Sequence, residues 1–181
     1  MKGYLLEKNK SDNDLPYEDI TSIWLEERKG ENGICDNQDF FVDKNDNKYD
    51  VDGVNVILDH SRSEDKIARF YAKTKQIDVR MLPRVLNPKN VKTGDFIEET
   101  TGIIWEIKEP IGYTVGTTIL NQFKNQKNKA CHFIIDMHKS DMEIEIVIRE
   151  IESILTNNRY NWIEEVIIMK NLQIKKVFRK K

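Results

Sequence analysis

Apolar and polar positions follow two different periods along the chain, and the change of period separates the expected helices from the expected strands. In residues 142–157 the apolar side chains recur every three or four positions, which predicts an amphipathic helix. Short apolar runs such as residues 131–137 and 162–169 are bounded by polar or turn residues, which is typical of buried strands. The chain therefore predicts a protein that mixes helices and strands.

The order of these elements indicates the fold class. From residue 63 onward we expect helices at 63–73, 117–128 and 142–157, and strands at 77–82, 95–99, 103–108, 131–137, 162–169 and 173–178. Helices that interrupt a series of strands in this way are typical of a mixed central sheet flanked by helices. The predicted class is thus α/β (α+β).

The first 50 residues differ from the rest and are expected to form an N-terminal accessory region. A short helix is predicted at 17–28, and strands are predicted at 40–42 and 49–58 around a polar turn. We therefore divide the chain into residues 1–50 and a main domain of residues 51–181.

Composition restricts the class of protein. The 181 residues are 39% hydrophobic and 33% charged, as expected for a soluble globular chain. No apolar run approaches the roughly 18 residues needed to span a bilayer, and the first residues are too polar for a secretory signal. The two cysteines, Cys35 and Cys131, argue against a disulfide framework or a cysteine zinc site. A reducing cytosol is therefore the expected place of action, with export as part of a larger system left open.

The net charge of −2 hides a strong asymmetry. Residues 1–60 hold 7 Lys/Arg and 15 Asp/Glu, so 7 − 15 = −8, whereas residues 61–181 hold 22 and 16, so 22 − 16 = +6. The second stretch is suited to attract a polyanion such as nucleic acid. A solubilising acidic segment attached to an ordinary domain explains the same numbers equally well.

The strongest chemical signal lies in the hairpin of residues 95–108. A tight turn near residues 100–102 places Asp95 opposite Glu106, and Lys108 projects from the same face as Glu106. The strand is otherwise made of Ile and Trp, so these charges should be buried, which is costly without a partner or a metal. The alternative is an edge hairpin whose polar face lies in water.

A third carboxylate, Glu64, falls on the inward stripe of the helix at 63–73. It is either a site residue or a first-turn acid favoured by the helix dipole. Together with Asp95 and Glu106 it predicts a site for a divalent cation (Mg²⁺, Mn²⁺ or Zn²⁺) that neutralises charge on a scissile phosphate. Lys108 is then expected to orient or deprotonate the attacking water or to stabilise the transition state.

These residues carry a resemblance to known proteins. Gly94-Asp95, ten further residues and then Glu106-Ile107-Lys108 resemble the PD-(D/E)xK nuclease motif, with Gly94 in place of its proline. The helix, three strands, helix and strand from residue 63 are similar to the restriction-endonuclease-like core of that superfamily. More narrowly, residues 51–181 resemble the C-terminal toxin domains of contact-dependent growth inhibition proteins and related polymorphic toxins. The similar stretches are residues 58–61, 92–96, 105–108, 133–136 and 166–168.

The resemblance implies specific roles and partners. Asp95, Glu106 and Lys108 match the nuclease motif, and Glu64 matches the carboxylate of the preceding helix. It implies a metal-dependent nuclease that cleaves tRNA or DNA and is neutralised by a cognate immunity protein.

Weaker signals suggest substrate contacts. His60 lies just before the helix that carries Glu64, Thr93 lies two residues before Asp95, and Gln122 and Gln126 share one face of the helix at 117–128. We name His60, Thr93, Gln122 and Gln126 as candidate substrate-binding residues, although core polar contacts explain the two glutamines equally well. His132 and His138 flank a strand and are expected to be structural.

Two other functions fit the same sequence. The first is a metal-independent RNase toxin of the barnase or colicin type, which would use His60, Lys108 and Thr93. The second is a non-catalytic nucleic-acid-binding or phage-associated protein with a nuclease-like fold. Activity in EDTA separates the two enzyme hypotheses, and absence of activity with every metal favours the non-catalytic one.

Overall fold

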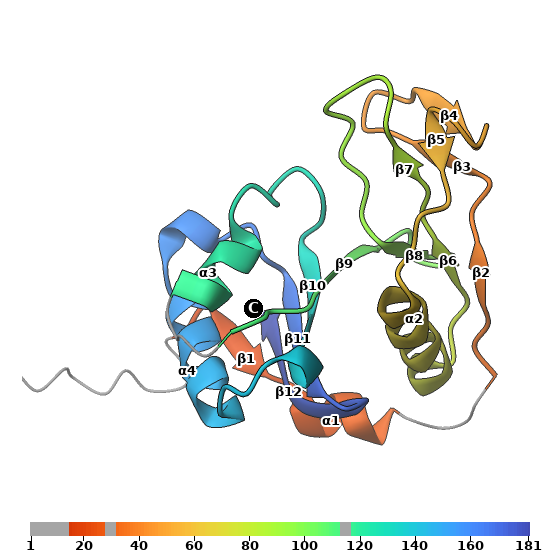
Figure 1. Ribbon diagram of the computed structural model, residues 1–181. Coiled ribbons are helices and arrows are strands. Elements are labelled where there is room, and N and C mark those ends of the chain that lie inside the picture. Colours follow the sequence, from red (N-terminus) through yellow and green to blue (C-terminus); the bar gives the residue numbers. More distant parts are fainter. Residues whose placement is uncertain (1–14, 28–31, 113–116) are drawn as a thin grey trace, which may run out of the picture.

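A central mixed sheet organises the protein (Figure 1). The computed structural model describes residues 15–27, 32–112 and 117–181, and in them an eight-stranded sheet has the order β1-β12-β11-β10-β9-β8-β6-β2. Its strands are β1 (Tyr17–Asp19), β2 (Cys35–Asn37), β6 (Val79–Met81), β8 (Phe96–Glu98), β9 (Ile104–Lys108), β10 (His132–Asp136), β11 (Glu165–Lys170) and β12 (Gln173–Lys180). The helices are α1 (Thr21–Glu26), α2 (Arg62–Lys75), α3 (Thr117–Phe123) and α4 (Ile144–Leu155), with 3-10 turns at Met137–Lys139 and Asn158–Tyr160.

Strand direction within the sheet is mixed, which confirms the predicted fold class. Strands β9, β10 and β11 run parallel, as do β2 and β6, whereas β6-β8, β8-β9, β11-β12 and β1-β12 are antiparallel. A parallel strand needs cover on both faces, and the apolar run of β10 is accordingly buried from Phe133 to Asp136.

Helices cover both faces of this sheet and create two cores. On one face α2 packs Ile67 and Tyr71 against a cluster that includes Phe96 and Trp105. On the other face α3 and α4 belong to a second cluster around Phe133. Each large apolar side chain buried in this way contributes about 1.5–3 kcal/mol, so both cores hold the strands of the site in place.

A small lobe adjoins the β2 end of the sheet. Strands β3 (Phe40–Val42) and β4 (Lys48–Asp50) form one antiparallel pair, and β5 (Val56–Ile57) and β7 (Arg84–Val85) form another. The strand predicted over 49–58 is therefore divided in two. The reason is Asp52, whose Oδ1 accepts hydrogen bonds from three backbone N–H groups, those of residues 54, 55 and 56.

Two further details differ from the sequence-based expectation. Helix α3 ends at Phe123 rather than at residue 128, because Asn125 takes a left-handed conformation with φ 61°. Residues 17–37, placed by sequence in an accessory region, supply β1 and β2, the two edge strands of the main sheet. The stretch 1–50 thus contributes directly to the central sheet. Across the described ranges, no helix has both the length and the apolar character needed to cross a bilayer.

Candidate active site

The β8–β9 hairpin has the register predicted from the sequence. Phe96 lies opposite Trp105, and Ile97 lies opposite Ile104. The turn is closed by Gly102 at φ 72°, a conformation that side chains disfavour. This register brings Asp95 and the E-x-K segment to adjacent strands.

Close packing in this fold explains why a glycine, Gly94, replaces the proline of the motif. A Cβ on Gly94 would lie 2.2 Å from Cγ2 of Ile104 and 3.0 Å from the carbonyl oxygen of Trp105. The two strands therefore approach too closely for any side chain at this position. The glycine allows Asp95 to enter the hairpin directly beside β9.

Asp95 is fixed to β9 through its backbone and its side chain. Its N–H donates to the carbonyl of Trp105 at 2.9 Å, and its Oδ2 accepts the N–H of Ile107 at 2.6 Å. The Asp95 carboxylate thus accepts the Ile107 N–H of β9 in place of a backbone carbonyl.

The pKa of Asp95 is raised to about 7, first by burial and then by the negative charge of Glu106. Lys129 and the Ile107 hydrogen bond oppose this rise, and Glu64 adds to it. Asp95 thus feels the negative charges of both Glu106 and Glu64, although the ligand atoms of these three acids are not among those of the described residues that lie within 4.8 Å of one another. Such mutual repulsion is what a cation would relieve.

Glu106 is the most deeply buried of these acids, at 1% exposure. Its Oε1 forms ion pairs with Lys108 and, at 2.6 Å, with Lys129. Its Oε2 is buried and has no hydrogen-bond partner among the described residues. Since buried carboxylate oxygens are costly without a partner, this atom is suited to receive a ligand.

Lys129 is a site residue that the sequence had not identified. It pairs with Glu106 from the loop before β10. The parallel pairing of Phe133 with Glu106 brings this loop to the site. No local sequence signal marks such a contact, because it depends on the order of strands.

Glu64 has a structural role that coexists with its predicted one. Ser61 is the N-cap of α2, and the two residues form a capping box: Glu64 N–H donates to Ser61 Oγ at 3.1 Å, and Ser61 N–H donates to Glu64 Oε2 at 2.7 Å. The helix start thus orients the Glu64 carboxylate, and its charge reaches Asp95.

The predicted substrate residues divide into two groups. His60 is half-buried, its Nε2 has no partner among the described residues, and burial lowers its pKa while Glu64 opposes that change. Thr93 is buried near Asp95. In contrast, Gln122 donates to the carbonyl of Thr118 at 2.9 Å, and Gln126 donates to that of Lys124 at 3.3 Å. The glutamine amides are therefore engaged locally and make no described contact with the carboxylates.

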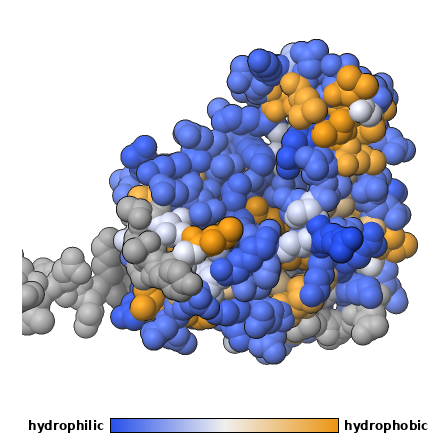
Figure 2. All heavy atoms as spheres, viewed as in Figure 1, coloured by the Kyte–Doolittle hydropathy of each residue, from blue (hydrophilic) through white to orange (hydrophobic). Residues whose placement is uncertain are grey.

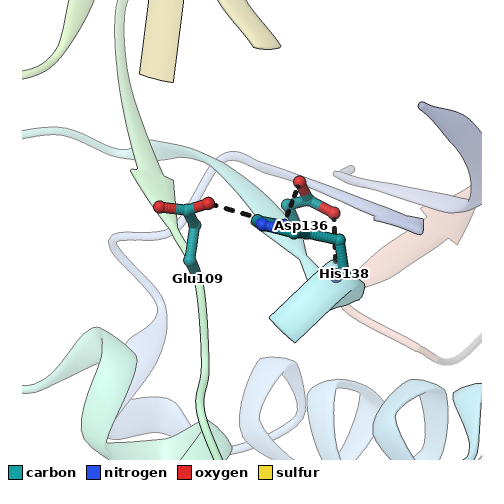
Figure 3. A group of neighbouring side chains, drawn as sticks. All are labelled: Glu109, Asp136 and His138. Atoms are coloured by element: carbon teal, nitrogen blue, oxygen red, sulfur yellow. Dashed lines mark hydrogen bonds and ion pairs between the residues drawn. The ribbon is translucent and has the colours of Figure 1, made fainter. Parts of the chain in front are cut away.

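A second group of possible ligands, Glu109, Asp136 and His138, lies at the ends of β9 and β10 (Figure 3). Its ligand atoms lie within 4.8 Å of one another. His138 Nδ1 is 2.8 Å from Asp136 Oδ2 and 3.4 Å from Glu109 Oε1. We call these three residues the second cluster. The sequence reasoning missed it as a group, although it expected a structural role for His138.

Comparisons with known proteins bear on the same part of the chain. Residues 92–174 match the family model described as the contact-dependent growth inhibition CdiA C-terminal domain, which confirms the predicted resemblance to the C-terminal toxin domains of contact-dependent growth inhibition proteins. Among solved structures, the CdiA-CT/CdiI toxin and immunity complex from Burkholderia pseudomallei is similar at 21% identity and a TM-score of 0.43, covering 66% of this chain and 83% of that chain. No curated protein sequence matches the chain.

Proposed function

We propose that this chain is a metal-dependent nuclease that cleaves phosphodiester bonds of tRNA or DNA, acting as a toxin in the cytoplasm of a target bacterium. The observation that carries this proposal is the carboxylate pair formed by Glu106, which is buried, and Asp95, which is half-buried. One member has an oxygen without a partner, and the other has a pKa raised to about 7. Both features are expected of a site that binds a cation.

The donor atoms fit a hard divalent cation. Asp95, Glu106 and Glu64 offer carboxylate oxygens, the ligands preferred by Mg²⁺ and Mn²⁺ and also used by Zn²⁺. The free Oε2 of Glu106 provides a ready position, and one Glu64 oxygen is held by the Ser61 cap. These three residues would hold the metal ion.

The chain's own residues divide the remaining work. When bound, the metal ion neutralises charge on the scissile phosphate. Lys108 shares a face with Glu106 and places its ammonium beside that carboxylate, where it can orient the attacking water or stabilise the negative charge of the transition state. Lys129 pairs with the same Oε1 atom of Glu106 and adds a second positive charge that can attract the phosphate.

The order of elements supports the same assignment. Helix α2 is followed by the antiparallel strands β6, β8 and β9, then by α3 and by β10 parallel to β9. This is the arrangement implied by the resemblance to the PD-(D/E)xK core. The match of residues 92–174 to the growth-inhibition family supports the toxin role.

A cleavage assay tests the proposal. Purified chain is incubated with total tRNA and with plasmid DNA in Mg²⁺, Mn²⁺, Zn²⁺ or EDTA. We expect cleavage of one substrate with at least one metal and none in EDTA or in the Glu106→Gln variant. Cleavage that persists in EDTA contradicts metal dependence and favours the metal-independent RNase, and absence of cleavage in every condition contradicts the nuclease.

We also propose that a cognate immunity protein neutralises the chain. A nuclease would damage its own producer, and the +6 charge of residues 61–181 suits an acidic inhibitor. Expression of the wild-type chain in a bacterium without any neighbouring gene should stop growth, and Glu106→Gln should not. Harmless expression of an active wild-type nuclease contradicts the need for such a partner.

A further inference from the structure

A groove lined by cations leads away from the carboxylate pair. A hollow of about 550 Å³ lies between the small lobe and the start of β10, and it is lined in part by Lys44, Lys89, Lys92 and Lys129. A second hollow of about 500 Å³ lies beside α3 and the 3-10 turn Asn158–Tyr160. Both hollows are lined by Lys92 and Asn128, so they adjoin. We call them together the basic groove.

Most of the cations in this groove form no ion pair with another described residue. Six of its cations form no ion pair with a carboxylate in the described part of the chain: Lys44, Lys89, Lys92, Lys124, Lys127 and Arg159. The lining contains one acid, Asp43, whose oxygens accept hydrogen bonds from Asn45, Asn47 and Tyr49. The groove thus concentrates positive charge, which attracts a polyanion.

This charge is a local property of the groove. A hollow at the other edge of the sheet combines Glu18, Asp19 and Glu152 with two lysines. Figure 2 shows a hydrophilic surface between α3 and the small lobe, while apolar side chains gather on the lobe itself. The groove also contains exposed asparagines, such as Asn90 and Asn128, which can donate to phosphate oxygens.

Contacts in the structure connect the groove to the site. Lys129 lines the first hollow and pairs with Glu106 Oε1 at 2.6 Å. Lys92 lines both hollows, lies three residues before Asp95 and donates to the carbonyl of Asn125 at 2.9 Å. A chain of phosphates in the groove would therefore pass beside the carboxylate pair.

We propose that the basic groove holds the phosphodiester backbone of the nucleic acid next to the cleaved bond. This inference rests on the proposed nuclease function and adds the path of the substrate. The half-buried Trp162 lines the second hollow beside Arg159 and offers a surface on which a base can stack. Because lysines dominate the charged lining of both hollows, binding should depend on charge more than on sequence.

Binding in EDTA tests this proposal separately from cleavage. The full-length chain is titrated into fluorescein-labelled single-stranded RNA and duplex DNA of 20 nucleotides or base pairs, at several salt concentrations. Two variants each remove one pair of charges: Lys44→Gln/Lys89→Gln from the first hollow and Lys124→Gln/Lys127→Gln from the second. The control Lys73→Gln/Lys175→Gln removes two exposed lysines outside the groove.

Each groove variant should weaken binding of the preferred nucleic acid roughly ten-fold near 100 mM salt. The slope of log K against log salt should also fall by about 1.4 for single strands or 1.8 for duplex, because two phosphate contacts are lost. The control should stay within about two-fold of wild type. Unchanged affinity and slope in both groove variants, or an equal loss in the control, overturns the proposal.

Two further outcomes are informative. If the groove variants weaken binding but the wild type cleaves nothing with any metal, the groove proposal stands and the nuclease proposal fails. Poly-L-glutamate serves as a polyanion without phosphates. If it binds as tightly as the nucleic acids and is weakened equally by the groove variants, the groove is a general acidic-protein surface, and the proposal of a nucleic-acid path is wrong.

Discussion

Two groups of acidic residues lie near the ends of β8, β9 and β10, and their surroundings differ sharply. In the second cluster every carboxylate oxygen has a partner. The carboxylate of Asp136 accepts a hydrogen bond from the backbone N–H of His138 and contacts the ring nitrogen of the same residue. The carboxylate of Glu109 accepts hydrogen bonds from Ser63 and Lys139, and the His138 ring nitrogen lies 3.4 Å from it. In the carboxylate pair, Glu106 keeps one buried oxygen without any partner in the described residues.

The difference shows how a satisfied group of acids is distinguished from one that awaits a ligand. The type and spacing of the ligand atoms favour the second cluster, because it offers a histidine and two carboxylates within 4.8 Å. Hydrogen bonding favours the carboxylate pair, because Lys108 and Lys129 both pair with Oε1 of Glu106 and its buried Oε2 has no partner among the described residues. Loss of a metal ligand should therefore reduce activity at the carboxylate pair, whereas the second cluster should stabilise the fold by joining β9 to β10.

The largest expected effect is on the cleavage rate, when one carboxylate charge is removed from the carboxylate pair and, for comparison, one from the second cluster. Glu106→Gln should lower the initial rate of nucleic acid cleavage by at least about 10³-fold, since a ligand of the metal is lost. The matched change Glu109→Gln should keep the rate within about five-fold, because the amide oxygen can still accept from Lys139 while the Ser63 hydroxyl accepts from the amide nitrogen. Equal losses in the two variants would remove the distinction between the groups.

Lys108→Met should lower the cleavage rate by about 10²-fold or more while leaving the affinity for Mn²⁺ within a few-fold of wild type. A protonated lysine does not ligate a metal, and Lys129 remains paired with Glu106 to support its position. Calorimetric titration with Mn²⁺ measures the affinity. A collapse of Mn²⁺ binding in this variant would show that Lys108 belongs to the metal site itself.

The metal-free protein should lose stability as the pH rises towards the pKa of Asp95. Since Asp95 has a pKa of about 7 in the folded state against 3.8 ordinarily, the folded protein retains a proton that the unfolded chain has released between about pH 4 and 7. Stability from this group is therefore greatest below that window and falls as the pH rises through it.

Asp95→Asn tests this pH dependence in melting experiments in EDTA. The variant should be more stable than wild type at pH 8 by about 1–2 kcal/mol, since each pKa unit is worth about 1.4 kcal/mol and solvent screens part of it. The gap should close near pH 4. A variant that melts well below wild type at pH 8 would instead indicate that the hydrogen bond to Ile107 is the main role of Asp95.

The smallest effect is expected for the predicted substrate glutamines. Gln122→Ala should change KM for the nucleic acid by less than about three-fold, because its amide bonds to the carbonyl of Thr118 in its own helix. His60→Gln is the comparison, because its ring nitrogen is buried without a partner and lies next to the α2 cap. A larger KM change for Gln122 than for His60 would reverse this ranking.

The sequence predicted those features that depend on local periodicity. The register that pairs Phe96 with Trp105 followed from the turn and the alternation of β8 and β9. The alternation also placed Lys108 on the face of Glu106, as their ion pair confirms. These relations hold within one hairpin and need no knowledge of the rest of the fold.

Contacts between distant segments were not predictable in the same way. Lys129 joins Glu106, and Asp136 joins Glu109 through His138, only because β10 lies parallel to β9. Residues 17–37 were set aside as accessory because their composition differs, yet backbone pairing places them at both sheet edges. A one-dimensional pattern carries no information on which strands become neighbours.

The central claim is that the carboxylate pair binds one divalent cation and the second cluster binds none. Calorimetric titration of the full-length protein with Mn²⁺ at pH 7.5 tests it most directly, with Asp95→Asn, Glu106→Gln and His138→Gln measured alongside. We predict one strong site per chain in wild type and in His138→Gln, and none in Asp95→Asn or Glu106→Gln. Loss of the strong site in His138→Gln, with its retention in Glu106→Gln, would contradict the account and move the metal to the second cluster.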